Sequence, residues 1–181
     1  MATIKIIHRA SICGYVRDAE TNATIAGATV EIVGRNAQTR SRDDGFYHFL
    51  DVPDGAYTLH AAAPMLGSRY ADVTVANVVV ASQADGRPSF DPRGNLNLPP
   101  TRLSGHVQRS GTLAPIARAE VRLRAAGVRT LSDDLGHYVL SPAQAGEQTV
   151  QVSAPGFAAG SQRVALTAGQ STTADFVLTP S

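Results

Sequence analysis

The chain has 181 residues, 43% of them hydrophobic, and carries 16 Lys and Arg against 15 Asp and Glu. This near balance excludes the basic surface by which proteins hold phosphate backbones, so nucleic acid is not an expected partner. The single cysteine, Cys13, excludes internal disulfides and zinc sites built from several thiolates. At roughly 150 residues per domain, the length allows one large domain or two small ones.

The first nine residues carry charges within their apolar stretch. A secretory signal needs roughly 7–15 uninterrupted apolar residues, so no signal peptide is expected in the given chain. No stretch approaches the roughly 20 apolar residues that span a bilayer, so no membrane span is expected either. Localisation stays open between assembly in the cytoplasm and an extracellular or injection particle.

Alternating apolar and polar residues predict half-buried β-strands in chain order at 28–32, 57–61, 73–75, 119–123, 149–152 and 163–166. Glycine and aspartate turns separate them, for example Asp43-Asp44-Gly45 and Pro53-Asp54-Gly55. Residues 114–126 are rich in helix formers, but Pro115 and their alignment with residues 23–35 favour a strand. The pattern predicts an all-β fold of the sandwich type.

The two halves of the chain repeat each other at an offset of 91 residues. Over residues 11–75, 18 of 65 positions are identical in this one register, which includes Asp43-x-Gly45-x-Tyr47 on Asp134-x-Gly136-x-Tyr138. The closing patterns at 96–98 and 176–178 are offset by only 80. We therefore expect 11 surplus residues in the first copy, in an inserted loop around 77–94.

Four motifs occur in order: Gly-x-Val, Ile-x-x-Ala-x-Val-x-Ile, Ser-x-Asp-x-Gly-x-Tyr-x-Phe and Val-Pro-x-Gly-x-Tyr-x-Leu. They lie within residues 14–59 and recur, less completely, within 105–150, where Gln148 replaces the last tyrosine. This order resembles the carboxypeptidase regulatory-like domain, a family similar to transthyretin. The resemblance implies two tandem seven-stranded Greek-key β-sandwiches of the transthyretin-like or immunoglobulin-like kind. We place them at 1–99 and 100–181, joined near the stiff Pro99-Pro100 pair.

The resemblance implies accessory or structural modules, and the residues agree. The five histidines lack the His-x-His spacing of ring-cleaving dioxygenases, and the chain end lacks the Tyr-Arg-Gly-Ser of the transthyretin-like hydrolase. Asp43 and Asp44 have the chemistry of calcium ligands, but turn formation explains them better. Tyr47 and Tyr138 are expected to pack a ring at the sheet edge with the hydroxyl on solvent or a carbonyl. We expect no enzyme activity, no catalytic residue, no metal and no cofactor.

Contact residues are the remaining candidates. The insertion holds an aromatic between two arginines, and an apolar loop tip follows Pro64, so the predicted binding residues are Arg87, Phe90, Arg93, Met65 and Leu66. Open sheet edges offer a second route, strand addition by a protein partner.

Fifteen arginines against one lysine are typical of a GC-rich bacterial genome. The sequence thus predicts a non-catalytic structural or interaction module, a spacer or adaptor in a larger bacterial assembly such as a contractile injection particle or surface appendage. The alternative is a carbohydrate-binding accessory module, although the absence of Trp counts against it.

Overall fold

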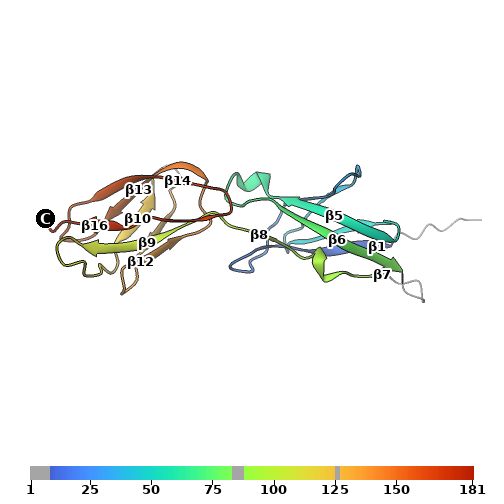
Figure 1. The fold of residues 1–181 in the computed structure, drawn as a ribbon, viewed down its shortest axis with the longest axis horizontal. Coiled ribbons are helices and arrows are strands. Elements are labelled where there is room, and N and C mark those ends of the chain that lie inside the picture. The colour runs from blue at the N-terminus through green and yellow to red at the C-terminus, as the bar shows by residue number, and fades with distance from the viewer. Residues whose placement is uncertain (1–8, 83–87, 125–126) are drawn as a thin grey trace, which may run out of the picture. The chain divides into compact units, whose positions relative to one another are not determined.

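The structure, a computed structural model, describes residues 9–82, 88–124 and 127–181 (Figure 1). Apart from two short 3₁₀ turns, η1 (Pro64–Leu66) and η2 (Pro92–Gly94), every regular element in these ranges is a β-strand. In chain order they are β1 (Ala10–Asp18), β2 (Thr29–Ile32), β3 (Gln38–Arg40), β4 (Phe46–Leu50), β5 (Gly55–Ala62), β6 (Val73–Ser82), β7 (Pro88–Ser89), β8 (Leu96–Leu98), β9 (Arg102–Arg109), β10 (Glu120–Leu123), β11 (Arg129–Leu131), β12 (His137–Leu140), β13 (Gly146–Ser153), β14 (Gly160–Leu166), β15 (Ser171–Thr173) and β16 (Phe176–Leu178). The predicted all-β fold is confirmed.

The chain divides into two compact units. Unit 1 comprises residues 1–65 and 72–99, and unit 2 comprises residues 66–71 and 100–181. The predicted domain boundary between residues 99 and 100 stays a prediction. The two compact units change at this same point, but unit 2 also includes the short segment 66–71.

Hydrogen bonds explain why residues 66–71 belong to unit 2. The N–H of Thr101 donates to the Arg69 carbonyl at 2.7 Å, and its hydroxyl donates to the Ser68 carbonyl at 2.9 Å. The N–H and the hydroxyl of Ser68 both lie 2.9 Å from Oε1 of Gln144, which accepts from them. Buried Thr101 is thus fully used as a donor to this segment.

Unit 1 is a sandwich of two sheets. The order is β4-β1-β8 in one sheet, with β8 parallel to β1, and β3-β2-β5-β6-β7 in the other. Apolar side chains from alternate strand positions fill the space between the sheets, because successive residues of a strand point to opposite faces. The buried set includes Val16, Ile25, Val30, Ile32, Tyr47, Leu59, Val78, Val80, Leu96 and Leu98.

Unit 2 repeats this plan with β12-β9-β15 and β16 beside β9 in one sheet, and β11-β10-β13-β14 in the other. Its core contains Leu103, Val107, Val121, Leu123, Tyr138, Val150, Val152 and Phe176. Seven strands of unit 1 correspond in chain order to seven of unit 2, whereas β7 and β15 have no counterpart. The sandwich predicted for each copy is confirmed.

The predicted single insertion is wrong in one respect: the surplus of the first copy lies in three places. Ala61 pairs with Val73, twelve positions on, whereas its counterpart Val152 pairs with Gly160, eight positions on. A register shift between Tyr57 and Leu59 adds one more residue, and the six others lie between β6 and β8. The sequence alignment does not show these separate insertions, because the chance identity of Val73 with Val164 extends the offset of 91 past the loop that precedes β6.

Candidate functional site

The same buried tyrosine braces both sandwiches. The hydroxyl of Tyr47 donates to the Gly94 carbonyl at 2.6 Å, and that of Tyr138 donates to the Ala174 carbonyl at 2.6 Å. Both tyrosines lie on edge strands, β4 and β12, and their hydroxyls bond a carbonyl as expected, while their rings are buried in the core. Burial raises the pKa of both phenols well above its ordinary value. Each therefore stays a neutral hydrogen-bond donor near neutral pH.

A buried serine serves each copy in the same way. Ser41 donates its hydroxyl to the Ile25 carbonyl at 2.7 Å and accepts the N–H of Ala28 at 2.9 Å. Ser132 makes the equivalent bonds to the Ile116 carbonyl and the Ala119 N–H at the same distances. These hydroxyls satisfy backbone groups of the chain that precedes β2 and β10, so they belong to the framework.

Of the two aspartates interpreted above as turn residues, Asp44 holds its turn through a side-chain hydrogen bond. Oδ1 of Asp44 accepts the N–H of Phe46 at 2.9 Å. In unit 2 the capping carboxylate is Asp133, which accepts the N–H groups of Leu135 at 2.9 Å and His137 at 2.8 Å. Within the described ranges, no group of three or more His, Cys, Asp or Glu side chains is arranged to hold a metal ion.

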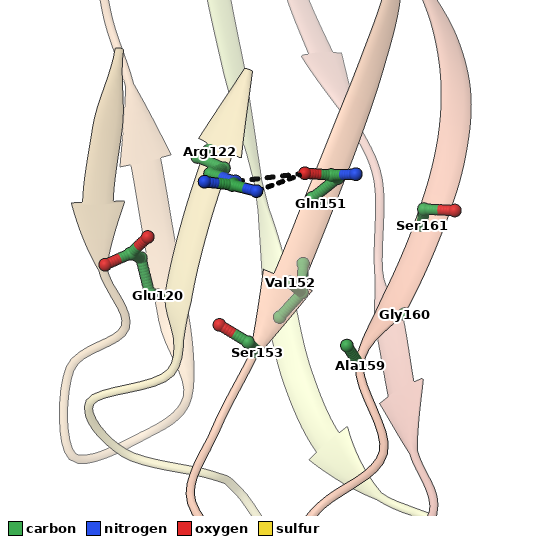
Figure 2. Close-up of a pocket in the computed structure, with 8 residues that line it drawn as sticks. All are labelled: Glu120, Arg122, Gln151, Val152, Ser153, Ala159, Gly160 and Ser161. Carbon is green, nitrogen blue, oxygen red and sulfur yellow. Dashed lines mark hydrogen bonds between the residues drawn. The ribbon is translucent and has the colours of Figure 1, made fainter. Parts of the chain in front are cut away.

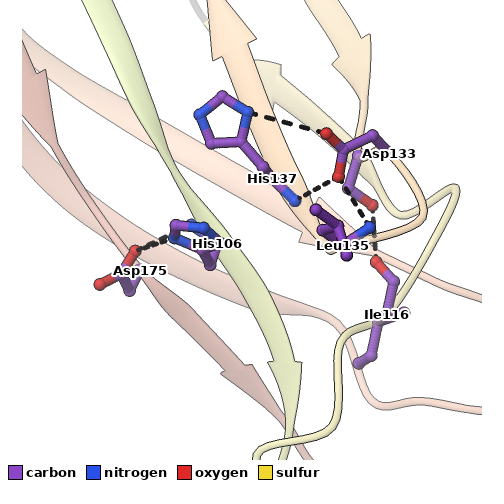
Figure 3. A network of polar contacts seen from close by, with 7 residues as sticks. His106, Ile116, Asp133, Leu135, His137 and Asp175 are labelled. Atoms are coloured by element: carbon purple, nitrogen blue, oxygen red, sulfur yellow. Dashed lines mark hydrogen bonds and ion pairs between the residues drawn. The ribbon is translucent and has the colours of Figure 1, made fainter.

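A polar network lies on the outer face of the β12-β9 pair (Figure 3). His106 and His137 are directly opposite each other in the register, with ring centroids 5.3 Å apart. Nδ1 of His106 lies 3.6 Å from Asp175, and Nδ1 of His137 lies 3.9 Å from Asp133. Each imidazole therefore has a carboxylate beside it at an exposed site.

A shallow hollow of about 380 Å³ lies on the outer face of β10, β13 and β14 (Figure 2). Among its lining residues, the guanidinium of Arg122 donates to Oε1 of Gln151, at 3.0 Å from Nε and 2.7 Å from Nη2. Glu120, Ser153 and Ser161 also line it. This open, polar surface offers hydrogen bonds rather than an enclosed pocket.

The sequence-predicted contact residues differ in their exposure and in the groups that hold them. Phe90 is 51% exposed and Met65 73% exposed, as an anchor for a partner requires. The Arg93 guanidinium is held by Asp91, at 3.1 Å from Nη2 to Oδ2. Leu66 is partly buried in unit 2, and its carbonyl accepts Nε2 of Gln144 at 3.2 Å. Arg87 lies outside the described residues.

Sequence reasoning missed an aromatic surface on β1 and β4, which we call the Tyr15 face: Tyr15, Phe46 and His48, flanked by Arg17 and Arg42. The Tyr15 and Phe46 rings meet edge to face at 5.5 Å, and the Phe46 and His48 rings stack at 5.8 Å. The guanidinium groups lie 4.8 Å from the Tyr15 ring and 5.6 Å from the Phe46 ring. Strict alternation around Gly14 and Val16 was the available signal, since it directs Tyr15 outward.

Cys13 lies on the same outward side of β1, directly opposite His48 in the register. Its partial burial raises the pKa of the thiol, which disfavours the nucleophilic thiolate near neutral pH.

Comparison with known families assigns the fold. The carboxypeptidase regulatory-like domain matches residues 11–88 and again residues 102–179. The chain belongs to this family. Its two copies of the domain correspond to the tandem that the motif order predicts. Comparison with curated proteins gives no significant match.

Several solved structures are similar to this chain at low sequence identity. The shaft pilin SpaA from Lactobacillus rhamnosus GG has a TM-score of 0.47 and 11% identity, over 96% of this chain and 97% of that chain. The Bacillus anthracis TIE protein has a TM-score of 0.42 and 13% identity, over 94% of this chain and 34% of that chain. A cohesin–X-dockerin complex from Acetivibrio cellulolyticus has a TM-score of 0.37 and 24% identity, over 50% of this chain and 57% of that chain. Scores this low carry no functional inference. The described residues contain no helix long and apolar enough to cross a membrane.

Proposed function

We propose that this carboxypeptidase regulatory-like tandem is a non-catalytic structural or interaction module, a spacer or adaptor in a larger bacterial assembly such as a contractile injection particle or surface appendage. The observation that carries the proposal is the duplicated internal framework. Tyr47 and Tyr138 brace their sandwiches through the same bond, and Ser41 and Ser132 do the same around a second pair of backbone groups.

The chemistry of these groups supports contact rather than catalysis. A nucleophile needs a lowered pKa or an adjacent base. Here burial raises the pKa of the Cys13 thiol and of both buried phenols, and the Ser41 and Ser132 hydroxyls already donate to carbonyl oxygens at 2.7 Å. The buried polar groups therefore stabilise the domains, and exposed groups are left for recognition.

A protein partner would find two kinds of surface. Phe90 and Met65 project from loops of unit 1 and offer apolar anchors of the kind that dominate binding energies. Strand edges offer main-chain hydrogen bonds, which suit an adaptor because they accept many sequences.

The test is affinity purification of the tagged full chain from its native host after chemical cross-linking, with quantitative mass spectrometry. We expect a stoichiometric complex with the same partner in every replicate. Phe90→Ala should reduce its yield, while Val33→Ala, another exposed apolar position in unit 1, should not. Recovery of the chain alone, at cross-linker doses that capture known complexes of the host, would overturn the proposal.

The carbohydrate-binding alternative gains one observation, the Tyr15 face. Sugars stack on outward aromatic rings, and the ring cluster with its flanking arginines suits an acidic sugar. A glycan array and titration with uronic acid oligosaccharides test it. Binding that is lost in Tyr15→Ala but kept in Phe90→Ala would favour this function over the adaptor.

A further inference from the structure

β6 and β14 are equivalent strands of the β3-β2-β5-β6-β7 and β11-β10-β13-β14 sheets, but only β6 is followed in its sheet by a further strand, β7. Oδ2 of Asp91 accepts the N–H of Val79 at 2.8 Å, and Ala81 pairs with Ser89 of β7. Between these contacts and the start of the strand, Asn77 has a φ of +59° beside the register shift. Bulges, carboxylates and short covering strands are the devices that prevent pairing with another chain.

β14 has none of these devices within the described residues. It pairs with β13 in one unbroken register from Gly146↔Leu166 to Val152↔Gly160. The N–H of Arg124 donates to the Thr149 carbonyl, so Thr149 and its alternate neighbours in β13 bond toward β10. The even-numbered residues of β13 therefore bond to β14, and they pair with the even-numbered residues of β14.

It follows that Ser161, Arg163 and Ala165 direct their N–H and C=O groups away from the sheet. No backbone or side-chain group in residues 9–82, 88–124 and 127–181 is recorded as a hydrogen-bond partner on that side. Figure 2 shows Ser161 on β14, beyond β13 and its Gln151. Unit 2 thus presents a regular, seven-residue edge to an incoming strand.

We propose that this edge binds the β14 edge of a second copy of the chain, as an antiparallel pair centred on Val164. This register places each Arg163 opposite the partner's Ala165, so that these two outward-bonding residues form hydrogen-bonded pairs. A register centred on Arg163 would instead set the two guanidinium groups directly opposite, which is destabilising. The proposal deepens the interaction role put forward above and rests on it.

Charge complementarity supports a second copy as the occupant. On the outer face, Glu147 of β13 lies opposite Ala165 of β14. In the proposed dimer, Ala165 of one chain lies between Glu147 of the same chain and Arg163 of the second copy. Its small side chain leaves open the space between these two charged residues, which spans two strand spacings or about 9.6 Å. An extended arginine and glutamate together bridge this gap. Two-fold symmetry makes the contact twice, and the ion pairs within the described part of one chain include neither Arg163 nor Glu147.

Analytical ultracentrifugation of the full chain from about 1 to 500 µM tests the proposal. We expect a monomer–dimer equilibrium with a Kd in the micromolar range, typical of a small interface. Ala165→Pro, which removes an outward N–H that an edge strand does not need for its own fold, should abolish the dimer. Arg163→Glu and Glu147→Arg should each weaken it about tenfold, and the double exchange should restore it. Arg40→Glu on β3 is the matched control and should change nothing.

Circular dichroism and the melting temperature must show that the variants fold. A chain that stays monomeric at 500 µM overturns the proposal, and so does a dimer that tolerates both Ala165→Pro and Arg163→Glu. Failure of the adaptor role is distinguishable, because cross-linking in the host detects other partners even when the purified chain is monomeric.

Discussion

The Asp91 carboxylate joins the β6 edge to the segment that follows it, because Oδ2 accepts the N–H of Val79 at 2.8 Å while Oδ1 accepts the N–H of Arg93 at 2.9 Å. One side chain thus caps the exposed edge and fixes η2, the turn whose last residue, Gly94, supplies the carbonyl that Tyr47 binds. The first copy has a longer segment between β6 and β8 than the second copy has after β14, and this segment covers the edge of β6.

The Val79 and Arg93 hydrogen bonds lower the pKa of Asp91 below its ordinary value. A lowered folded-state pKa adds stability that is complete above the ordinary carboxyl pKa, about 3.9, and is lost as the pH falls through the lowered value. We expect Asp91→Asn to melt at a lower temperature than the wild type at pH 7. This difference should persist to about pH 5 and shrink below pH 4 in differential scanning calorimetry. A difference that grows on acidification would contradict the assignment.

Tyr138→Phe should destabilise unit 2 by about 1–3 kcal/mol, because it leaves the buried Ala174 carbonyl without its donor. Tyr47→Phe should do the same to unit 1 through Gly94. Urea denaturation with a probe in each unit measures both. Tyr57→Phe is the control, since that hydroxyl bonds the Pro53 carbonyl at an exposed site and should matter less. Equal losses in all three variants would refute the bracing role.

Gln148→Met should stabilise unit 2 by about 1 kcal/mol. Gln148 stands where the first copy has Tyr57, and its buried Oε1 accepts no hydrogen bond in the structure. An apolar side chain of similar volume removes this desolvation penalty. Gln144→Met is the matched control and should destabilise, because Oε1 of Gln144 accepts two bonds from Ser68. Thermal melts of the two variants should therefore shift in opposite directions.

Gly105→Ala should prevent unit 2 from folding normally. A Cβ at this position overlaps the carbonyl oxygen of Ala174, and one at Gly14 overlaps that of Gly94. The obstacle is backbone, so it cannot rotate away. We expect broadened amide resonances in the NMR spectrum and a loss of several kcal/mol. Gly111→Ala, where nothing lies within 4 Å of an added Cβ, is the comparison, although its φ of +85° adds strain of its own.

The repeat and the motif order predicted much of the fold because the matching residues are structural. Gly14 and Gly105 leave room for a neighbouring carbonyl, and the hydroxyls of Tyr47 and Tyr138 donate to that same carbonyl. Such constraints keep residue identity in both copies. Loop insertions and register shifts do not require particular residues at matching positions, so the sequence did not predict the extra residues before β6.

The candidate surfaces were less predictable, since outward positions carry no packing constraint. Tyr15 and Phe46 in the first copy become His106 and His137 in the second, at the same facing positions of the register. Aromatic residues in an alternating strand predict a sheet face but not which neighbours share it. Likewise the open edge of β14 depends on what the rest of the chain fails to cover, which only the arrangement of strands reveals.

A tandem that works by contact rather than by chemistry, as we propose, should be found bound to its partners in the host. The most direct measurement is gradient sedimentation of native host lysate, with quantitative detection of the chain and of its Phe90→Ala variant. We expect the wild-type chain to sediment with a large assembly in a fixed ratio to its components, and the variant to shift toward the light fractions. A wild-type chain found only in the light fractions, at the position of the purified protein, would contradict it.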